Sequence, residues 1–198
     1  GNNVFKAYKK YDDDMPESKY QEWQVNVLNE CYRVLKHDGS MFYNHKNRIV
    51  KGVSIVPYEW IFKTNFLIKQ EIVWFNGSQN FDKIRFYPMT ERVYWLAKNK
   101  STTIVNKNGM TDFQKWNAVG TSGEHKRSFP IEMAQDILNC FPDKKEVLDP
   151  FLGSMTTALA CYDLGMNITG AELDPDYFKA GMERVRKHTS QVRLDDLI

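Results

Sequence analysis

The sequence contains few cysteines, no metal-ligand pattern and no long hydrophobic run. Its three cysteines, Cys31, Cys140 and Cys161, are widely spaced and form no C-x-x-C pair, which argues against a disulfide framework. Each lies in a segment with helical periodicity, so we expect buried thiols in a reducing compartment. No group of His, Cys and Asp has metal-ligand spacing, so we expect no metal. Apolar runs are only a few residues long and no signal peptide is visible, so we expect no membrane segment.

An excess of charge of one sign is lacking as well. Lys and Arg number 27 against 25 Asp and Glu, so the formal charge is +2, and a polyanionic partner would have to meet a local basic patch. The 198 residues are enough for a single domain with a hydrophobic core. The sequence begins at Gly1 rather than at a methionine, and we expect it to be a fragment.

Helical and strand patterns alternate along most of the chain. Helices are predicted at 17–35, 53–62 (starting near Pro57), 131–140, 156–164 and 176–187, and strands at 40–45, 66–75, 92–98, 146–149 and 167–172. Residues 98–124 are polar and without a clear period, which is typical of a surface excursion. This alternation predicts an α/β fold with a mostly parallel sheet covered by helices on both faces.

A glycine turn between two acids is the most informative feature of the sequence. In "VLDPFLGSMTTALACYDLGMNITGAELDPDYF", Asp149 ends one predicted strand and Glu172 ends the next. Gly153 allows the backbone to approach a ligand closely, and hydroxyls and N–H groups are offered where the next helix starts, by Ser154, Thr156 and Thr157. Ligands of doubly wound sheets bind beyond the carboxyl ends of the strands, and an acid at the second strand end accepts hydrogen bonds from ribose hydroxyls.

Two nucleoside cofactors would suit such an acid. NAD requires a G-x-G-x-x-G turn for its pyrophosphate, whereas this turn has Gly153 followed by Ser-Met-Thr-Thr and places Asp149 where phosphates would lie. S-adenosylmethionine carries a sulfonium and an ammonium, which an acid near the turn attracts, so we favour it. The alternative without a ligand is that the acids cap helices and the glycine only turns the chain.

These residues carry a resemblance to a known family. "HKRSFPIEMAQDIL…EVLDPFLGSMTTALACYDLGMNITGAELDPDYF" resembles the cofactor half of the DNA amino-methyltransferases, which modify adenine N6 or cytosine N4. The positions that fill the family's pattern are His125, Phe129, Pro130, Asp149, Pro150, Phe151, Gly153, Ser154, Thr156, Thr157, Gly170, Glu172 and Tyr177. Met155 departs from the pattern, because the family has glycine there, and its side chain either points away from the cofactor or narrows the pocket.

The resemblance extends over nearly the whole chain and implies a circularly permuted, Rossmann-like methyltransferase of the beta class. A target-side half at 1–99 precedes the 100–124 excursion, a candidate target-recognition region, and a cofactor half at 125–198. The implied cofactor is S-adenosylmethionine and the implied partner is double-stranded DNA. A homodimer and a cognate restriction nuclease are compatible with the family, and a cytoplasmic location in a prokaryote or phage is expected.

The family's catalytic loop, (Asp/Asn/Ser)-Pro-Pro-aromatic, is not visible, since no Pro-Pro pair occurs. In relatives this loop would precede Gly1, so we expect it upstream, and no catalytic residue is assigned. The alternatives are a non-catalytic protein that binds the cofactor or DNA, and a methyltransferase that acts on RNA. Adenine is favoured as the target because it is the commoner one in the family.

Basic and aromatic residues are interleaved in the part that resembles the family's target-side loop, "NGSQNFDKIRFYPMTE". Arg85 and Phe86 are the favoured DNA-binding residues, and solvated surface lysines are the alternative explanation for the basic ones. The wider candidate set is Lys83, Lys98, Lys100, Lys107, Lys126, Arg127, Phe81 and Trp116. Asn44 and His45 end the predicted strand 40–45 and are expected at the ligand-facing edge, unless they only form a turn.

Overall fold

The computed structural model describes residues 15–77, 81–106, 108–117 and 128–190. The predicted site residues His125, Lys126 and Arg127, and the candidate Lys107, lie outside the described residues. The chain divides into two compact units, one within Asp14–Asn117 and the other containing Ala118–Ile198. Each unit is described on its own below.

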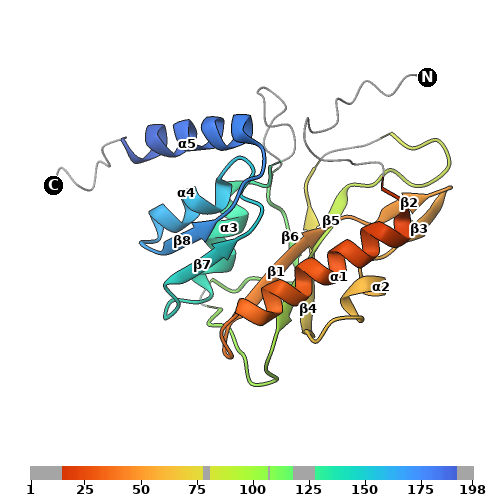
Figure 1. Ribbon diagram of the computed structural model, residues 1–198, viewed down its shortest axis with the longest axis horizontal. Coiled ribbons are helices and arrows are strands. Elements are labelled where there is room, and N and C mark those ends of the chain that lie inside the picture. Colours follow the sequence, from red (N-terminus) through yellow and green to blue (C-terminus); the bar gives the residue numbers. More distant parts are fainter. Residues whose placement is uncertain (1–14, 78–80, 107, 118–127, 191–198) are drawn as a thin grey trace. The chain divides into compact units, whose positions relative to one another are not determined.

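A four-stranded sheet forms the centre of the first unit (Figure 1). Its strands are β1 (Ser40–His45), β4 (Leu67–Phe75), β5 (Thr90–Ala97) and β6 (Phe113–Gln114), in the order β1-β5-β4-β6. β5 pairs antiparallel with both β1 and β4, and β6 pairs parallel with β4. The C-terminal ends of β1 and β4 therefore meet the start of β5 at one end of the sheet.

Two helices cover one face of this sheet. The helix α1 (Glu17–Val34) presents Leu28, and the short helix α2 (Tyr58–Ile61) presents Trp60 and Ile61, to the alternate β5 residues Tyr94 and Leu96. These side chains are almost completely buried, and burying each apolar one contributes about 1.5–3 kcal/mol. Because successive strand residues point to opposite faces, the sequence of β5 places every second aromatic or aliphatic side chain in this core.

The segment predicted as a helix at 53–62 is only partly helical. Residues 53–55 form the strand β3 (Val53–Ile55), which pairs antiparallel with β2 (Arg48–Val50) across a tight turn. In that turn Lys51 and Gly52 both have positive φ, which a two-residue hairpin of this kind requires. The helix α2 begins only after Pro57, because proline at a helix start needs no hydrogen-bond partner for its nitrogen.

The second unit is a strand–helix–strand–helix arrangement preceded by one further helix. Its described elements are α3 (Ile131–Asn139), β7 (Glu146–Asp149), α4 (Thr156–Asp163), β8 (Asn167–Gly170) and α5 (Pro175–Thr189). β7 and β8 are parallel, with Asp149 opposite Gly170. All five elements were predicted from the sequence, and β8 is shorter than expected.

The expected α/β fold is confirmed, but the strand pairing is more mixed than a mostly parallel sheet. The described residues between β4 and β5 (76–77 and 81–89) contain no helix, and strands joined without a crossover helix pair antiparallel. Only β4–β6 and β7–β8 are parallel among the described strands. Within the part of the chain that the structure describes, no helix is long and apolar enough to cross a membrane.

The cysteines are largely as predicted. Cys140 and Cys161 are buried and Cys31 is half-buried, and all three are free thiols. Burial raises the pKa of the Cys140 thiol, and it raises the pKa of Cys161 to about 11. A thiol with a raised pKa carries little thiolate at neutral pH, so both side chains act as apolar packing groups.

Candidate functional site

The two acids of the sequence motif lie at adjacent strand ends. β7 ends at Asp149, and Glu172 lies two residues beyond the end of β8, which is the parallel neighbour of β7. Backbone hydrogen bonds connect the segments that follow the strands, from Leu152 N to Ala171 O at 2.9 Å and from Ala171 N to Asp149 O at 3.1 Å. The prediction that both acids occupy one edge of a parallel strand pair is confirmed.

The Glu172 carboxylate is held in place by two backbone groups. Oε2 accepts a hydrogen bond from Gly153 N at 2.8 Å, and Oε1 accepts one from Asp174 N at 2.8 Å. An ionised carboxylate has about four acceptor positions, so each oxygen keeps one for a further donor. Glu172 is thus oriented by the protein while it retains the capacity to accept two hydroxyl groups.

Asp149 is engaged more completely within its own turn. Its Oδ1 accepts from Phe151 N at 3.0 Å, and its Oδ2 accepts from the hydroxyl of Thr157 at 2.6 Å. Thr157 was predicted as a ligand-binding residue, and the structure uses its hydroxyl to hold Asp149. The carboxylate therefore connects the start of the turn to the first turn of α4.

Met155, which replaces the family's glycine, adopts a left-handed backbone conformation. Its φ is 61° and ψ is 30°, a region that glycine enters without strain and that costs other residues about 1 kcal/mol. Its side chain is only 2% exposed and packs against Gly181 of α5, where a Cβ would lie 2.8 Å from Met155 Cγ. Met155 therefore has a backbone conformation that suits glycine, and its side chain is buried against α5.

The acids do not act as helix caps. Asp174 caps α5, since its Oδ1 accepts from Asp176 N at 2.8 Å and from Tyr177 N at 3.3 Å. α4 starts at Met155 without any side-chain cap. Among the described residues, Asp149 accepts from no N–H at a helix start, and Glu172 accepts only from the N–H of Asp174, the residue before α5, while the first turn of α5 is capped by Asp174 itself.

Apolar side chains flank the two acids. Phe151 is 57% exposed and Leu173 is 70% exposed, although both are large hydrophobic residues. Each follows a strand end by a few residues, and exposed apolar side chains beside polar acceptors are typical of sites for ligands with an aromatic ring and hydroxyl groups.

The remaining described residues that were predicted to bind the cofactor make no hydrogen bond with the two acids. Phe129 is half-buried and Pro130 is buried at the start of α3, which packs against α4. Neither forms a hydrogen bond with Asp149 or Glu172 among the described residues. The N–H of Tyr177 is used in the cap of α5.

The polar strand end of the first unit forms a directional chain of hydrogen bonds. Trp60 Nε1 donates to Tyr43 Oη (3.0 Å), Tyr43 Oη donates to Gln24 Oε1 (2.8 Å), Gln24 Nε2 donates to Tyr20 Oη (2.8 Å), and Tyr20 Oη lies 2.6 Å from His45 Nε2. His45 Nδ1 bonds to the carbonyl of Lys46, which can only accept, so Nδ1 carries the proton and Nε2 accepts. His45 is thus the end of an ordered network and not a residue of a simple turn.

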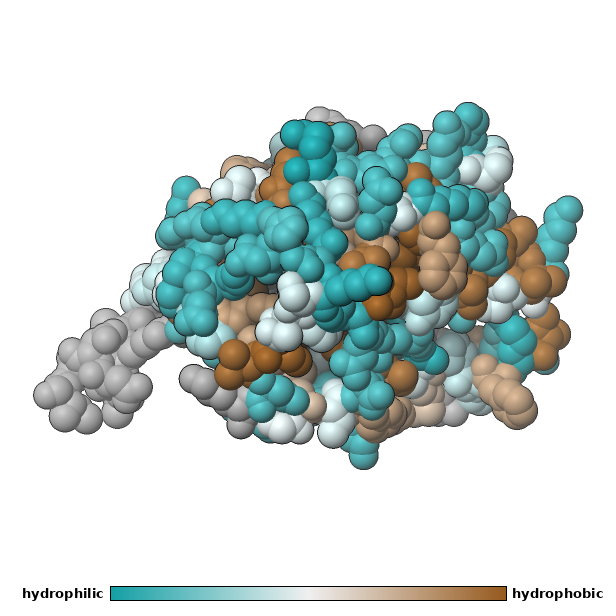
Figure 2. All heavy atoms as spheres, turned by 90° about the horizontal axis from the view of Figure 1, so that it is seen from below, coloured by the Kyte–Doolittle hydropathy of each residue, from teal (hydrophilic) through white to brown (hydrophobic). Residues whose placement is uncertain are grey.

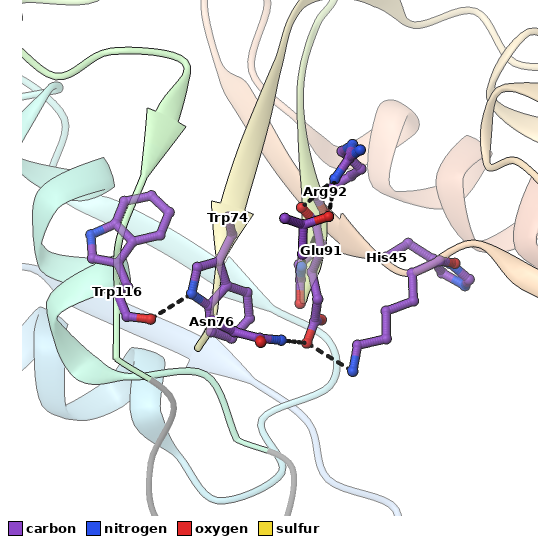
Figure 3. A network of polar contacts seen from close by, with 9 residues as sticks. His45, Trp74, Asn76, Glu91, Arg92 and Trp116 are labelled. Atoms are coloured by element: carbon purple, nitrogen blue, oxygen red, sulfur yellow. Dashed lines mark hydrogen bonds and ion pairs between the residues drawn. The ribbon is translucent and has the colours of Figure 1, made fainter. Parts of the chain in front are cut away.

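A second cluster lies at the same end of the sheet (Figure 3). Glu91 Oε1 accepts from Asn76 Nδ2 at 3.0 Å and pairs with Lys46 Nζ at 2.9 Å, and Arg92 Nε pairs with Glu71 at 2.7 Å. Asn44, predicted at the edge, donates to the carbonyl of Arg92 at 3.0 Å. Every charge in this cluster is paired, so it orients side chains and leaves no isolated ion.

The half-buried His45 predicts a pH effect on stability. Burial is the main cause that lowers the pKa of His45, with Arg48 adding to it and Glu17 and Glu91 opposing it. Because the unfolded chain takes up the proton at a pH near the ordinary value of about 6.5, the stability due to neutral His45 is present above that pH and lost as the pH falls below it.

We expect His45→Gln to flatten the decline of unfolding free energy between pH 7.5 and pH 5.5, as measured by urea denaturation. His37→Gln, at an exposed position, is the matched control and should keep the wild-type pH dependence. Equal declines in His45→Gln and the wild type would contradict the assignment of this effect to His45.

The predicted DNA-side loop carries exposed aromatic and aliphatic residues beside basic ones. Phe86 is fully exposed, and Phe81 and Ile84 are more than 70% exposed. Lys83 forms no ion pair with any described residue, whereas the Arg85 guanidinium is paired with Asp82, with Nε at 2.8 Å from Oδ2. On the face shown in Figure 2, hydrophobic patches lie among hydrophilic residues.

Three residues of the wider set of DNA-binding candidates lie away from the loop 81–87 or are buried. Trp116 is 2% exposed, and its carbonyl accepts from the Trp74 indole at 2.7 Å, so it is a core residue and not an exposed stacking platform. Lys98 and Lys100 follow the far end of β5, about 25 Å along the strand from Thr90. Lys98 instead lies over the Tyr32 ring and donates to the carbonyl of Arg33.

Sequence reasoning missed three residues that build the turn region. They are Arg184, which donates to the turn, Gly181, which makes room for Met155, and Asp174, which caps α5. The Asp-Pro pair at 174–175 is a helix-start signal, and an isolated glycine within a helical pattern indicates close packing, so both could have been recognised. Nothing in the local sequence identifies Arg184, because its partners lie about 30 residues earlier in the chain.

The fold is that of class I methyltransferases. The structure resembles that of the cytosine-N4-specific PvuII DNA methyltransferase, with a TM-score of 0.77 over 92% of this chain and 78% of that one, at 19% identity. It also resembles the M1.HpyAVI–SAM complex, with a TM-score of 0.66 at 25% identity, over 86% of this chain and 85% of that one.

The chain belongs to the N6/N4 DNA methylase family, whose model matches residues 2–183. Among its relatives, DNA adenine methyltransferase YhdJ of Escherichia coli K12 is 24% identical over 97% of this chain and 76% of its own length. The Type II beta methyltransferase M.BslI of Bacillus sp. NEB-606 is 26% identical over 84% of this chain, which spans only 24% of M.BslI. Family membership confirms the resemblance inferred from the motif.

Proposed function

We propose that this chain binds S-adenosylmethionine at the strand ends of its second unit and belongs to an enzyme that methylates an exocyclic amine of a DNA base. Adenine N6 is favoured as the target and cytosine N4 is the second choice. The observation that carries the proposal is the Glu172 carboxylate, which the backbone orients while two acceptor positions remain for ribose hydroxyls.

The residues at the strand ends suit this cofactor. Glu172 would hold the ribose, Phe151 and Leu173 would lie against the adenine ring, and Asp149 would set the turn and attract the cationic end. When bound, the cofactor supplies an electrophilic methyl group on its sulfonium. The contribution of this chain is to bind and orient that group, and a pyrophosphate would meet Asp149 with like charge.

For DNA, the support comes from the loop 81–87. Lys83 offers a cation for a phosphate, and the exposed ring of Phe86 offers an apolar surface that could occupy space in the duplex next to an extruded base. Arg85 and the excursion 100–124 complete the proposed target side, together with Lys126 and Arg127.

The proposed activity is tested with the full-length gene product and methyl-labelled S-adenosylmethionine. Duplex DNA is incubated with both, digested to nucleosides, and analysed for N6-methyladenine and N4-methylcytosine; label in N6-methyladenine is expected. Cofactor binding without label in DNA would overturn the transferase proposal in favour of a non-catalytic binding protein. Label in RNA alone would show that the substrate is RNA.

The ion pair in the loop gives a prediction on DNA binding. Asp82 accepts from Ile84 N and Arg85 N, and it neutralises the Arg85 guanidinium, so its pKa is lowered by these backbone and side-chain donors. Asp82→Asn keeps an oxygen for the backbone and releases Arg85. We expect the slope of log affinity against log salt to steepen by about 0.9, which corresponds to one more phosphate contact.

Filter binding of a duplex between 50 and 200 mM salt measures this slope. The control is Asp112→Asn, an exposed acid in the same unit, which should leave the slope unchanged. An unchanged slope in Asp82→Asn would show that Arg85 does not reach the phosphates.

A further inference from the structure

We infer that Arg184 is a positioning residue for the cofactor turn, and that its guanidinium holds residues 154–156 in the conformation from which Gly153 and Glu172 meet the ligand. This inference rests on the proposed binding of S-adenosylmethionine. It assigns to α5, which contains none of the motif's cofactor positions apart from Tyr177, a direct part in shaping the site.

The contacts of Arg184 converge on one short segment. Nη1 donates to Ser154 O at 2.8 Å, to Ser154 Oγ at 3.3 Å and to Thr156 Oγ1 at 3.0 Å. Ser154 and Thr156 are both buried, and their hydroxyls lie 3.1 Å apart. A single guanidinium thus donates to a carbonyl and two hydroxyls. Without it, these buried oxygens would lack a charged donor.

Among the residues that the structure describes, no acid balances the charge of Arg184. It is half-buried, no carboxylate of the described residues forms an ion pair with it, and desolvation lowers its pKa. Removing a cation from water without a counter-ion is costly, and a methionine or leucine would pack the same helix face at less cost. The observed use of an arginine is explained by its donors, which satisfy three acceptors of the turn.

The turn needs such support because its backbone is strained. Gly153 has φ 50° and Met155 has φ 61°, so two residues of the turn are left-handed and one of them is not glycine. α5 holds both parts of the turn from one face, because Gly181 and Arg184 are three residues apart and lie one above the other on a helix. Gly181 receives the Met155 side chain, and Arg184 binds the Ser154 carbonyl before it and the Thr156 hydroxyl after it.

Movement of this segment would be transmitted directly to the ligand acceptor. Ser154 follows Gly153, whose N–H is one of the two donors that orient Glu172. The Ser154 carbonyl and the Gly153 N–H belong to peptide units separated by one other, so a displacement of the first reaches the hydrogen bond to Glu172 through that single intervening peptide. Loss of Arg184 should therefore weaken cofactor binding more than it weakens the fold.

The test compares Arg184→Met with Arg186→Met in the full chain. Arg186 lies on the same helix, is largely exposed and, among the described residues, forms an ion pair with Glu183 alone, so it is a matched loss of charge. Calorimetric titration with S-adenosylmethionine is expected to show an affinity about tenfold weaker for Arg184→Met and within twofold of wild type for Arg186→Met. Arg184→Lys should recover part of the loss, because an ammonium can donate to the same carbonyl.

Hydrogen exchange separates positioning from general stability. Measured well below the unfolding temperature, the amides of Gly153 and Met155 should exchange faster in Arg184→Met, while amides of β7 and the middle of α4 keep wild-type rates. A folded Arg184→Met protein with wild-type affinity would overturn the inference. If that variant does not fold, Thr156→Val decides: an affinity two- to threefold weaker supports the inference, and an unchanged one overturns it.

The outcome also distinguishes this inference from the proposed function. A wild-type protein that does not bind S-adenosylmethionine removes both. A wild-type protein that binds it, together with an Arg184→Met variant that binds it equally well, removes only the role of Arg184.

Discussion

Replacing Glu172 with alanine is expected to weaken S-adenosylmethionine binding by about 100-fold or more. Two hydrogen bonds from ribose hydroxyls to a carboxylate contribute about 1.5 kcal/mol each at the low end of the usual range, and every 1.4 kcal/mol is a factor of ten. The variant also removes the acceptors of Gly153 N and Asp174 N, which adds disorder of the turn to the loss. Calorimetric titration of the folded variant measures the effect.

An analogue of the cofactor without the 2′-hydroxyl separates the two causes. Wild type should discriminate against this analogue, whereas Glu172→Ala should bind both compounds almost equally weakly, since the acceptor that senses the hydroxyl is gone. Asp176→Ala, an exposed acid in the first turn of α5, is the control and should keep wild-type affinity. Unchanged affinity in a folded Glu172→Ala protein would remove Glu172 from the site.

Gly181→Ala is expected to lower the free energy of unfolding by about 1–2 kcal/mol, although alanine is the better helix former by about 1 kcal/mol. The new Cβ would lie 2.8 Å from Met155 Cγ and 3.1 Å from its Sδ, so the buried methionine must move. Overpacking of this kind costs about 1–3 kcal/mol, which outweighs the gain in helix propensity.

The same substitution should be stabilising when Met155 is glycine. In that background the contact is absent, the helix propensity gain remains, and the double-mutant coupling is expected to be about 2 kcal/mol. Ala180→Gly, at the neighbouring helix position, should cost the same in both backgrounds. Additive effects of Gly181→Ala and Met155→Gly in urea denaturation would contradict the packing of these residues against each other.

Much of the fold could be predicted from periodicity and turn residues. The helix α1 and the strands β1, β4 and β7 agree closely with the predicted ranges, because each is a regular pattern bounded by a proline or glycine or by a change of period. The error at 53–62 arose where the run was short. Three apolar or β-branched residues before Pro57 suit a strand as well as a helix, and the pairing with Arg48–Val50 decided between them.

The candidate DNA-binding residues also show what sequence patterns cannot predict. Trp116 and Phe86 are both aromatic residues near lysines, and the sequence does not separate them. In the structure Trp116 is 2% exposed and its carbonyl accepts from the Trp74 indole, whereas Phe86 is fully exposed in the segment between β4 and β5. Similarly, Arg85 was predicted to bind DNA, and its ion pair with Asp82 became visible only in the folded loop.

The sequence by itself determined the family and the two acids of the cofactor motif, because strand ends, a glycine turn and their spacing are local properties of the chain. Tertiary structure decided how those acids are used. It showed that Glu172 is oriented by Gly153 and Asp174, that Met155 keeps a glycine-like backbone by burying its side chain against Gly181, and that Arg184 holds the turn from below. Apart from the contact between Glu172 and Asp174, these contacts join residues 19 to 30 positions apart, which the pairing of β7 with β8 and the packing of α5 on the turn bring together.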